Sequence, residues 1–272
     1  TSMAQRRVEH WEQQGRKISL IQRESRVGYK AGALAHGLRK SQSEFVAIFD
    51  ADFIPPKDFL RKMMPSISAP DVGLVQARWS HLNRTQNWLT RTQATLLNGH
   101  FVIEHTARYR AKRFFNFNGT AGIWRRQCIE EAGGWSHDTV TEDLDLSYRA
   151  QLLGWDFVYR VDVTAPAELP SSMRAFLQQQ HRWTKGTVQT ARKLLRPILT
   201  SKFSLGIRLE AVNHLTMVAA YPLVLLLSML LPLSIAARTH LISDGAQWVD
   251  MLVVACTTGS IGLFYGQTIR QA

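Results

Sequence analysis

The stretch Phe45-Val46-Ala47-Ile48-Phe49-Asp50-Ala51-Asp52 decides the fold of this chain. Its apolar run is rich in branched and aromatic side chains and predicts a strand buried on both faces, as in a parallel sheet. Ligands of open α/β sheets bind beyond the carboxyl ends of such strands. Because residues two apart in an extended chain point the same way, Asp50 and Asp52 can reach one ligand. The pair predicts a metal–diphosphate site, since Mg²⁺ often joins one or two carboxylates to substrate phosphates; a solvated turn is the alternative.

Predicted strands and helices alternate on both sides of this stretch. The sequence predicts helices over residues 3–14, 31–38, 57–64 and 86–111, and further strands over 18–21, 72–79 and 156–161. Strands and helices in such succession favour right-handed parallel crossovers and an α/β fold.

Two loops of this predicted domain have the composition of binding segments. Residues 23–30 form a basic loop that leads into a helix N-terminus, where free N–H groups attract phosphate; Arg26 and Lys30 are the candidates, and a plain charged loop is the alternative. Residues 114–124 are first aromatic and then small. Small residues let the backbone approach a ligand, although a tight turn between buried strands has the same composition.

A helix is predicted to begin after Thr141, which is a plausible N-cap. An inward stripe (Leu144, Tyr148, Leu152) and an i,i+4 pair (Asp145, Arg149) support it. Glu142 and Asp143 lie in its first turn, where the helix dipole favours carboxylates for structural reasons. The functional alternative is that one of them is a general base, which takes a proton from a hydroxyl nucleophile.

The net charge of +12 is concentrated in two blocks. Residues 1–40 hold nine Lys/Arg against three acids, and residues 171–210 hold eight against one. Such segments favour an anionic partner, which is phosphate, a lipid surface or nucleic acid. Residues 171–195 are also amphipathic and predict one or two helices along a membrane surface. The two cysteines, Cys128 and Cys256, give no disulfide framework, which favours a reducing compartment.

Two uncharged stretches near the end of the chain predict membrane spans. Met217–Ala237 holds 21 residues and would extend roughly 30 Å as a helix, with prolines that membrane helices tolerate. Met251–Thr268 is a second, glycine-interrupted stretch. The basic residues before the first span predict that residues 1–210 lie in the cytoplasm.

Five motifs precede the first span: Lys30-Ala31-Gly32, Asp50-Ala51-Asp52, Phe117-Asn118-Gly119-Thr120, Thr141-Glu142-Asp143 and Gln179-Gln180-His181-Arg182-Trp183. In this order they resemble the membrane-bound family 2 glycosyltransferases of the cellulose synthase-like superfamily, and look closest to its mannan and glucomannan synthase-like branch and bacterial relatives. Each motif is short, but the ordered set covers nearly the whole chain. The resemblance implies a GT-A (Rossmann-like) α/β domain over residues 1–170, interfacial helices over 171–210 and transmembrane helices over 211–272, at about 213–237 and 249–268.

The resemblance also implies a role for each motif residue. Asp143, with Glu142 beside it, would be the catalytic base, and Asp52 would bind Mg²⁺ or Mn²⁺. The other expected contacts are with the nucleotide sugar (Lys30, Asp50, Gln179, Arg182) and with the acceptor (Trp183, Gly119, Thr120). The chemistry agrees, because glycosyl transfer needs cations at the leaving group and a base at the acceptor. A single base without a covalent nucleophile implies inversion at the anomeric carbon.

The expected activity is transfer of a hexose from a UDP- or GDP-sugar to a growing β-linked glucan or mannan at the cytoplasmic face of the cell membrane. The expected partners are the donor, a polysaccharide or lipid acceptor and membrane lipid, without nucleic acid. One alternative is a single-sugar transferase that makes a glycolipid. The other is a non-catalytic basic membrane-surface or nucleic-acid-binding protein, which explains the charge and the spans but not the five ordered motifs.

The chain departs from the family pattern in two ways. Nothing before Ile18 supplies the family's earlier acidic nucleotide-binding motif, so we expect that first strand to lie upstream of Thr1. The family's further spans are also absent. We therefore expect residues 1–272 alone to be inactive or poorly folded, and tight metal-dependent nucleotide binding by them would refute this.

Overall fold

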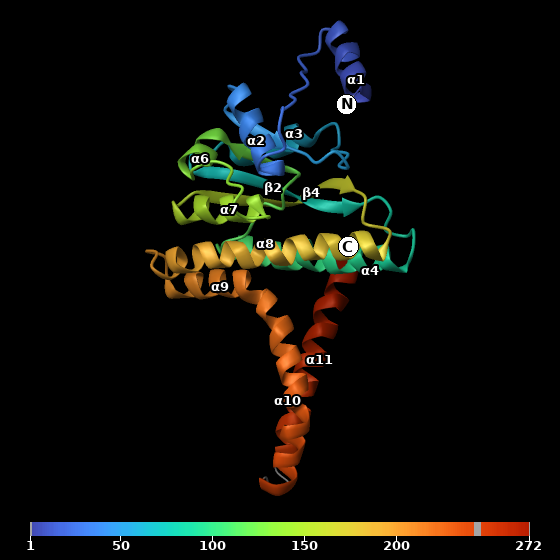
Figure 1. Cartoon of the computed structure of the whole chain (residues 1–272), viewed down its shortest axis with the longest axis vertical. Coiled ribbons are helices and arrows are strands. Elements are labelled where there is room, and N and C mark those ends of the chain that lie inside the picture. Colours follow the sequence, from blue (N-terminus) through green and yellow to red (C-terminus); the bar gives the residue numbers. More distant parts are fainter. Residues whose placement is uncertain (1, 242–245, 272) are drawn as a thin grey trace.

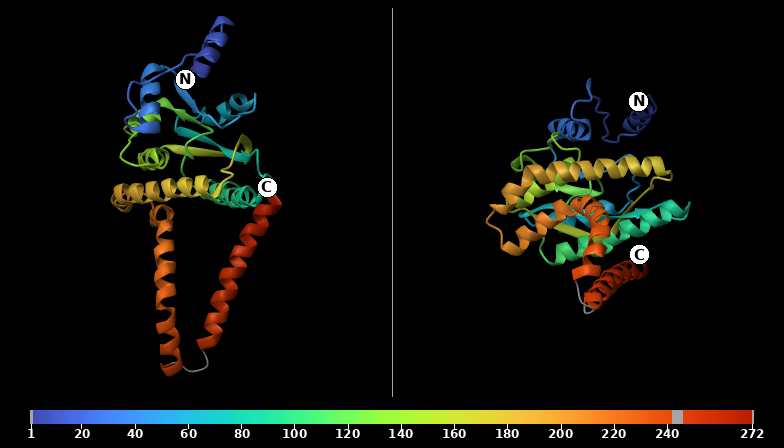
Figure 2. Two further views of the ribbon diagram at one scale, coloured as in Figure 1. Left: turned by 45° about the vertical axis from the view of Figure 1, so that its right-hand side comes forward. Right: turned by 60° about the horizontal axis from the view of Figure 1, so that its bottom comes forward.

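A computed structural model describes residues 2–241 and 246–271, with the side chains of residues 234–247, 249 and 271 left out. The chain forms an α/β domain above two long helices, which are separated where they meet the domain and converge away from it (Figures 1 and 2). Between them lies a layer in which helices α8 and α9 run nearly perpendicular to the two long helices (Figure 1).

The sheet has four strands in the order β1-β3-β2-β4. Their bounds are Phe45–Ile48 (β1), Val72–His81 (β2), Gly122–Arg125 (β3) and Asp156–Ala167 (β4). β3 runs antiparallel to both β1 and β2, whereas β2 and β4 are parallel. β1, β2 and β4 therefore point the same way, and their carboxyl ends meet at one edge.

The prediction of a strand at 45–48 is confirmed, but two expectations about it were wrong. β1 pairs with antiparallel β3 instead of a parallel neighbour, and it lies at an edge of the sheet, where Ala47 is exposed. The predicted strand at 18–21 is also absent. Ile18, Leu20 and Ile21 are 40%, 39% and 45% exposed, because no described strand lies beside them to supply hydrogen bonds.

Two apolar clusters cover the two faces of the sheet. Alternate residues of a strand point to opposite faces, so Leu74 and Trp124 join one cluster and Val75 and Ile123 join the other. Ala31 of α2, Ile129 of α6 and Leu146 of α7 complete the first cluster, and Phe59 and Met63 of α3 belong to the second. The helices before the interfacial layer are α1 (Ser2–Gln13), α2 (Tyr29–Lys40), α3 (Phe59–Met63), η1 (Met64–Ile67), α4 (Trp88–Asn98), π-helical η2 (Gly99–Glu104), α5 (His105–Arg110), α6 (Arg126–Glu131) and α7 (Glu142–Leu152).

A third cluster joins the domain to the layer below. The predicted stripe of α7 packs against α8 (Met173–Leu199) and α9 (Leu205–Thr216), through Leu194, Ile198, Ala211 and Leu215. The basic amphipathic stretch is thus one continuous 27-residue helix, α8, with Ser172 as its N-cap. The predicted Asp145–Arg149 pair is confirmed at 2.7 Å.

The last helices are η3 (Met217–Ala219), α10 (Ala220–Leu241) and α11 (Ala246–Gln271). Two stretches, Leu205–Leu233 and Asp250–Arg270, are long and apolar enough to cross a membrane, and 6% of each is buried. They overlap the predicted spans, although residues 242–245, and the side chains of residues 234–237 and 249, lie outside the described residues. α11 returns to the domain at η2, where a Cβ on Gly99 would lie 2.7 Å from the Phe264 ring.

Candidate active site

A cavity of about 320 Å³ opens at the carboxyl ends of β1 and β2, between the start of α7 and the first half of α8. Nine of the ten predicted site residues line it: Lys30, Asp50, Asp52, Gly119, Glu142, Asp143, Gln179, Arg182 and Trp183. The expectation that acids from two distant stretches meet in one pocket is therefore confirmed. The tenth residue, Thr120, is fully buried behind the wall, and its hydroxyl accepts a hydrogen bond from the Asp50 N–H at 2.9 Å.

Asp50 lies two residues beyond the end of β1 and is paired with a cation. Lys30, in the first turn of α2, donates to Asp50 Oδ1 at 2.5 Å and to the Gly119 carbonyl at 2.9 Å. This lysine thus ties together the α2 N-terminus, the β1 end and the 117–120 segment. Arg26, the other cation suggested for phosphate, is exposed and is not part of this cavity wall.

Glu142 and Asp143 begin α7 on the opposite wall. Burial and the neighbouring charge of Glu142 raise the pKa of Asp143 to about 7, against the weaker opposing effect of Lys30. Burial also raises the pKa of Glu142. Asp143 Oδ1 accepts a hydrogen bond from the Leu144 N–H at 2.8 Å, which fixes its orientation. A carboxylate with a pKa near neutrality, facing a cavity, has the properties of a general base.

Gly119 lies between the two walls and has a φ of +81°. A Cβ at this position would lie 2.9 Å from Asp143 Oδ2 and 3.4 Å from Lys30 Nζ. Glycine is therefore required here both by the left-handed backbone and by the close approach of the backbone to the two functional groups.

One face of α8 closes the cavity. Gln179, Arg182, Trp183 and Gly186 recur at spacings of three and four residues, so they share a face. A Cβ on Gly186 would overlap Thr141, so only glycine lets the start of α7 lie against α8. Thr141 has the predicted N-cap position, but its side chain makes no capping hydrogen bond, since it lies against α8, 3.4 Å from the Thr190 hydroxyl.

A buried ion network holds the same two helices in register. Asp145 of α7 is fully buried and lies 2.8 Å from Lys193 of α8. Arg149 binds the other Asp145 oxygen and donates to the carbonyls of Ala132 and Gly134. The network therefore sets how the Glu142–Asp143 turn faces the cavity side of α8.

The residues of this cavity fit a divalent cation that arrives with a diphosphate. Within residues 2–241 and 246–271, no group of three or more His, Cys, Asp or Glu side chains forms a metal site. Asp50 is engaged by Lys30, whereas Asp52 is exposed at the cavity, and the described residues offer it no hydrogen bond or ion pair. Mg²⁺ is commonly held by one or two carboxylates together with substrate phosphates and water, so one free carboxylate is sufficient.

Sequence reasoning missed Trp79, His81 and Glu168, which also line the cavity, and it gave no role to Asn118 of the 117–120 motif, which lines it too. Trp79 and His81 end β2, at the same sheet edge as Asp50, so the rule applied to β1 predicts their place as well. Burial lowers the pKa of His81 to about 4, so its imidazole is neutral at pH 7.

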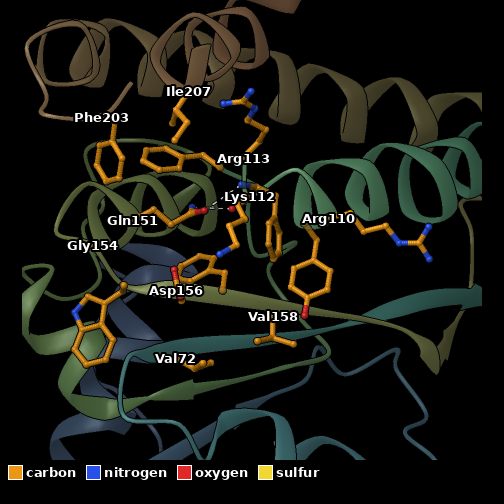
Figure 3. A pocket seen from close by; sticks show the side chains of 15 residues that line it. Val72, Arg110, Lys112, Arg113, Gln151, Gly154, Asp156, Val158, Phe203 and Ile207 are labelled. Carbon is orange, nitrogen blue, oxygen red and sulfur yellow. Dashed lines mark hydrogen bonds between the residues drawn. The ribbon is translucent and has the colours of Figure 1, made fainter. Parts of the chain in front are cut away.

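A larger cavity, of about 560 Å³, lies between α5, α7, β4 and α9 (Figure 3). Its wall combines aromatic side chains with Arg110, Lys112 and Arg113, which point in different directions (Figure 3). None of the predicted site residues lines it. Its size therefore does not mark the site, and the convergence of functional groups favours the smaller cavity.

Comparisons with known proteins identify relatives of this chain. The chain is 46% identical over 204 residues to the probable glucomannan 4-beta-mannosyltransferase 9 of Oryza sativa subsp. japonica, which covers 74% of this chain and 39% of the relative. It is 47% identical over 204 residues to glucomannan 4-beta-mannosyltransferase 2 of Arabidopsis thaliana, and this match covers 74% of this chain and 38% of that relative. The chain thus spans less than half the length of these curated relatives.

Two solved structures share the fold. One is the mannosyltransferase PcManGT from Pyrobaculum calidifontis in complex with GDP-Man and Mn²⁺, with a TM-score of 0.54, 20% identity, and coverage of 93% of this chain and 65% of that one. The other is TarS 1–349 of S. aureus, with a TM-score of 0.53, 12% identity, and coverage of 90% and 64%. At these identities the likeness concerns the fold alone, and it confirms the predicted GT-A class.

The family model described as Glycosyl transferase family group 2 matches residues 45–237. This match runs from the first residue of β1 into α10 and includes every predicted site residue except Lys30. The predicted resemblance is therefore confirmed, and this chain belongs to glycosyl transferase family group 2.

Proposed function

We propose that this chain is part of a metal-dependent, inverting hexosyltransferase that extends a β-linked polysaccharide of the mannan or glucan type from a nucleotide-diphosphate sugar. The observation that carries the proposal is that Asp52, Asp143 and Arg182 line one cavity, although they come from three separate motifs. A basic membrane-surface protein without catalysis gives no reason for this convergence.

Different residues of the cavity act on the acceptor and on the donor. Asp143 takes the proton from an acceptor hydroxyl, whose oxygen then attacks the anomeric carbon of the donor from the face opposite the leaving group. The bond to the nucleoside diphosphate breaks, and Lys30, Gln179 and Arg182 hold the departing phosphates. Trp183 supports the acceptor ring by stacking.

Asp52 would hold Mg²⁺ or Mn²⁺, which supplies positive charge for the diphosphate when it is bound. Gly119 contributes its backbone to the acceptor side, and Asp50 orients Lys30 through their 2.5 Å contact and reaches the donor. Thr120 acts indirectly, by fixing Asp50. Glu142 keeps the pKa of Asp143 high through its charge.

We also propose the arrangement of the whole chain at the membrane. Residues 1–170 form the catalytic domain, α8 and α9 lie along the cytoplasmic surface, and α10 and α11 cross the bilayer within the predicted region 211–272. The exposed apolar side chains of α10 and α11 support this arrangement, because such surfaces are costly in water. The basic residues before the first span support the cytoplasmic side.

The test gives membranes that contain the full-length protein labelled GDP- and UDP-hexoses with Mg²⁺ or Mn²⁺. GDP-mannose comes first, because the relatives are named as mannosyltransferases and PcManGT was solved with GDP-Man. We expect the label to enter a polymer only when the metal is present. Glycosidases specific for β-linkages, and not those specific for α-linkages, should release the labelled sugar from this polymer. Label confined to the lipid fraction would favour glycolipid synthesis, and transfer that survives full metal chelation would contradict the role of Asp52.

A further inference from the structure

A second cavity, of about 370 Å³, adjoins the first. The two share part of their walls: Trp79, Leu97, Asn118, Thr141, Asp143 and Trp183. From Asp143 the second cavity extends past η2 to Met217 and Val218, where α10 is about to begin. None of the donor-side residues Lys30, Asp52 or Arg182 lines the second cavity. Asp143 therefore lies between the donor side, in the first cavity, and the second cavity.

The wall of the second cavity carries a hydrogen-bonded chain of polar side chains. His100 Nδ1 lies 2.8 Å from a Glu104 oxygen, and His100 Nε2 lies 3.2 Å from Asn118 Nδ2. A carboxylate can only accept, so Nδ1 carries the proton donated to Glu104, and Nε2 accepts from the Asn118 amide. Asn118 Oδ1 is then left as a buried acceptor for which the described residues provide no donor.

The hydrogen-bonded side chains His100, Glu104 and Asn118 are fixed in place and remain accessible from the cavity. Both His100 and Glu104 belong to the π-helical turn η2, and their side chains are 27% and 32% exposed. The Asn118 N–H donates to Gln76 Oε1 at 3.1 Å, which fixes the far end of the chain. Burial alone would raise the pKa of Glu104, but the hydrogen bond that His100 donates helps to outweigh it and the pKa is lowered, so the carboxylate is ionised at neutral pH.

Aromatic rings complete the cavity. Trp79, Phe101 and Trp183 form its apolar part, against the polar part made by His100, Glu104 and Asn118. An apolar ring face beside fixed hydrogen-bonding groups matches a pyranose, which has apolar faces and a rim of hydroxyls. A lipid tail would leave the buried Asn118 Oδ1 without a hydrogen-bond donor.

We propose that His100 and Glu104 bind hydroxyl groups of the acceptor sugar and thereby select which sugar the enzyme extends. The proposal rests on the proposed function, and it assigns to η2 a role that none of the five motifs carries. Asp143 activates the reacting hydroxyl, while the His100–Glu104 pair reads other hydroxyls of the acceptor.

The test measures kinetics of the full-length protein in membranes with variants Glu104→Gln and His100→Gln. β-1,4-linked manno- and gluco-oligosaccharides serve as acceptors, because their sugar units differ only in the configuration of one hydroxyl each. Loss of a charged hydrogen bond raises the acceptor KM about tenfold or more. We expect this increase with an unchanged donor KM and a changed preference between the two acceptors. Glu130→Gln is the matched control, since Glu130 forms an equivalent i,i+4 pair with Arg126 outside both cavities.

An acceptor KM that stays at the wild-type value in both variants would overturn the proposal. An equal increase in the KM for donor and acceptor would also overturn the proposal, because it would indicate damage to the fold. A wild-type protein that transfers sugar to neither acceptor nor water, with any donor, would instead contradict the proposed function itself.

Discussion

Replacing Asp143 by Asn should stabilise the protein while removing its proposed base. The pKa of Asp143 is raised from 3.8 to about 7 in the fold. As the pH rises from about 4, the unfolded state releases this proton first, so folding stability falls until the folded-state pKa is reached. At about 1.36 kcal/mol per pH unit, a gap of about three units limits the loss to about 4 kcal/mol. Because Asp143 is partly exposed to the cavity, we expect about 2–3 kcal/mol.

The assay compares wild type and Asp143→Asn by thermal unfolding in detergent, without donor or metal, at pH 5 and pH 8. The advantage of the variant should be larger at pH 8 by about 1–3 kcal/mol, and each kcal/mol corresponds to roughly 2–4 °C in Tm. Asp162→Asn is the control. The hydrogen bond from Arg160 lowers the pKa of Asp162, so this variant should gain no stability over the wild type at pH 8. Equal stability of wild type and Asp143→Asn at both pH values would refute the reasoning.

The remaining predictions concern the geometry and the pH dependence of the same site. Gly119→Ala forces a Cβ to within 2.9 Å of Asp143 Oδ2, so kcat should fall about tenfold or more; an unchanged kcat would show that Asp143 need not be placed so closely. Gly186→Val should separate α7 from α8 and abolish transfer, whereas Gly37→Ala, whose Cβ meets open space, should leave activity intact, and equal behaviour of the two variants would count against the proposed helix contact. Because the base must be ionised, kcat/KM should fall about tenfold for each pH unit below about 7, and a profile flat down to pH 5 would exclude Asp143 as that base.

Patterns local in sequence predicted much of the site. The apolar run before Asp50, the stripe of α7 and the three- and four-residue spacing of Gln179, Arg182 and Trp183 each depend on neighbours within one element. Such periodicity identifies an element and its inner face without knowledge of its partners. The meeting of the acids and the α8 residues in one cavity was instead what the family resemblance implied.

Features set by distant partners were not predictable in this way. β3 inserts between β1 and β2 in the opposite direction, and this pairing makes β1 an edge strand. Thr141 has the sequence of an N-cap, but contact with Gly186 and Thr190, which lie over 40 residues later, directs its side chain elsewhere. Thr120 has its role through the Asp50 N–H, about 70 residues away. The sequence pattern contains no local sign of these contacts.

The central claim is that Asp143 activates the acceptor in a cavity whose other groups bind the donor. The most direct measurement is sugar transfer by Asp143→Asn in membranes that contain the full-length protein, together with metal-dependent binding of the nucleotide sugar. The account predicts that transfer falls by about 10² or more, as for a lost general base, while donor affinity changes little. Transfer within a few-fold of wild type, with donor binding intact, would contradict it.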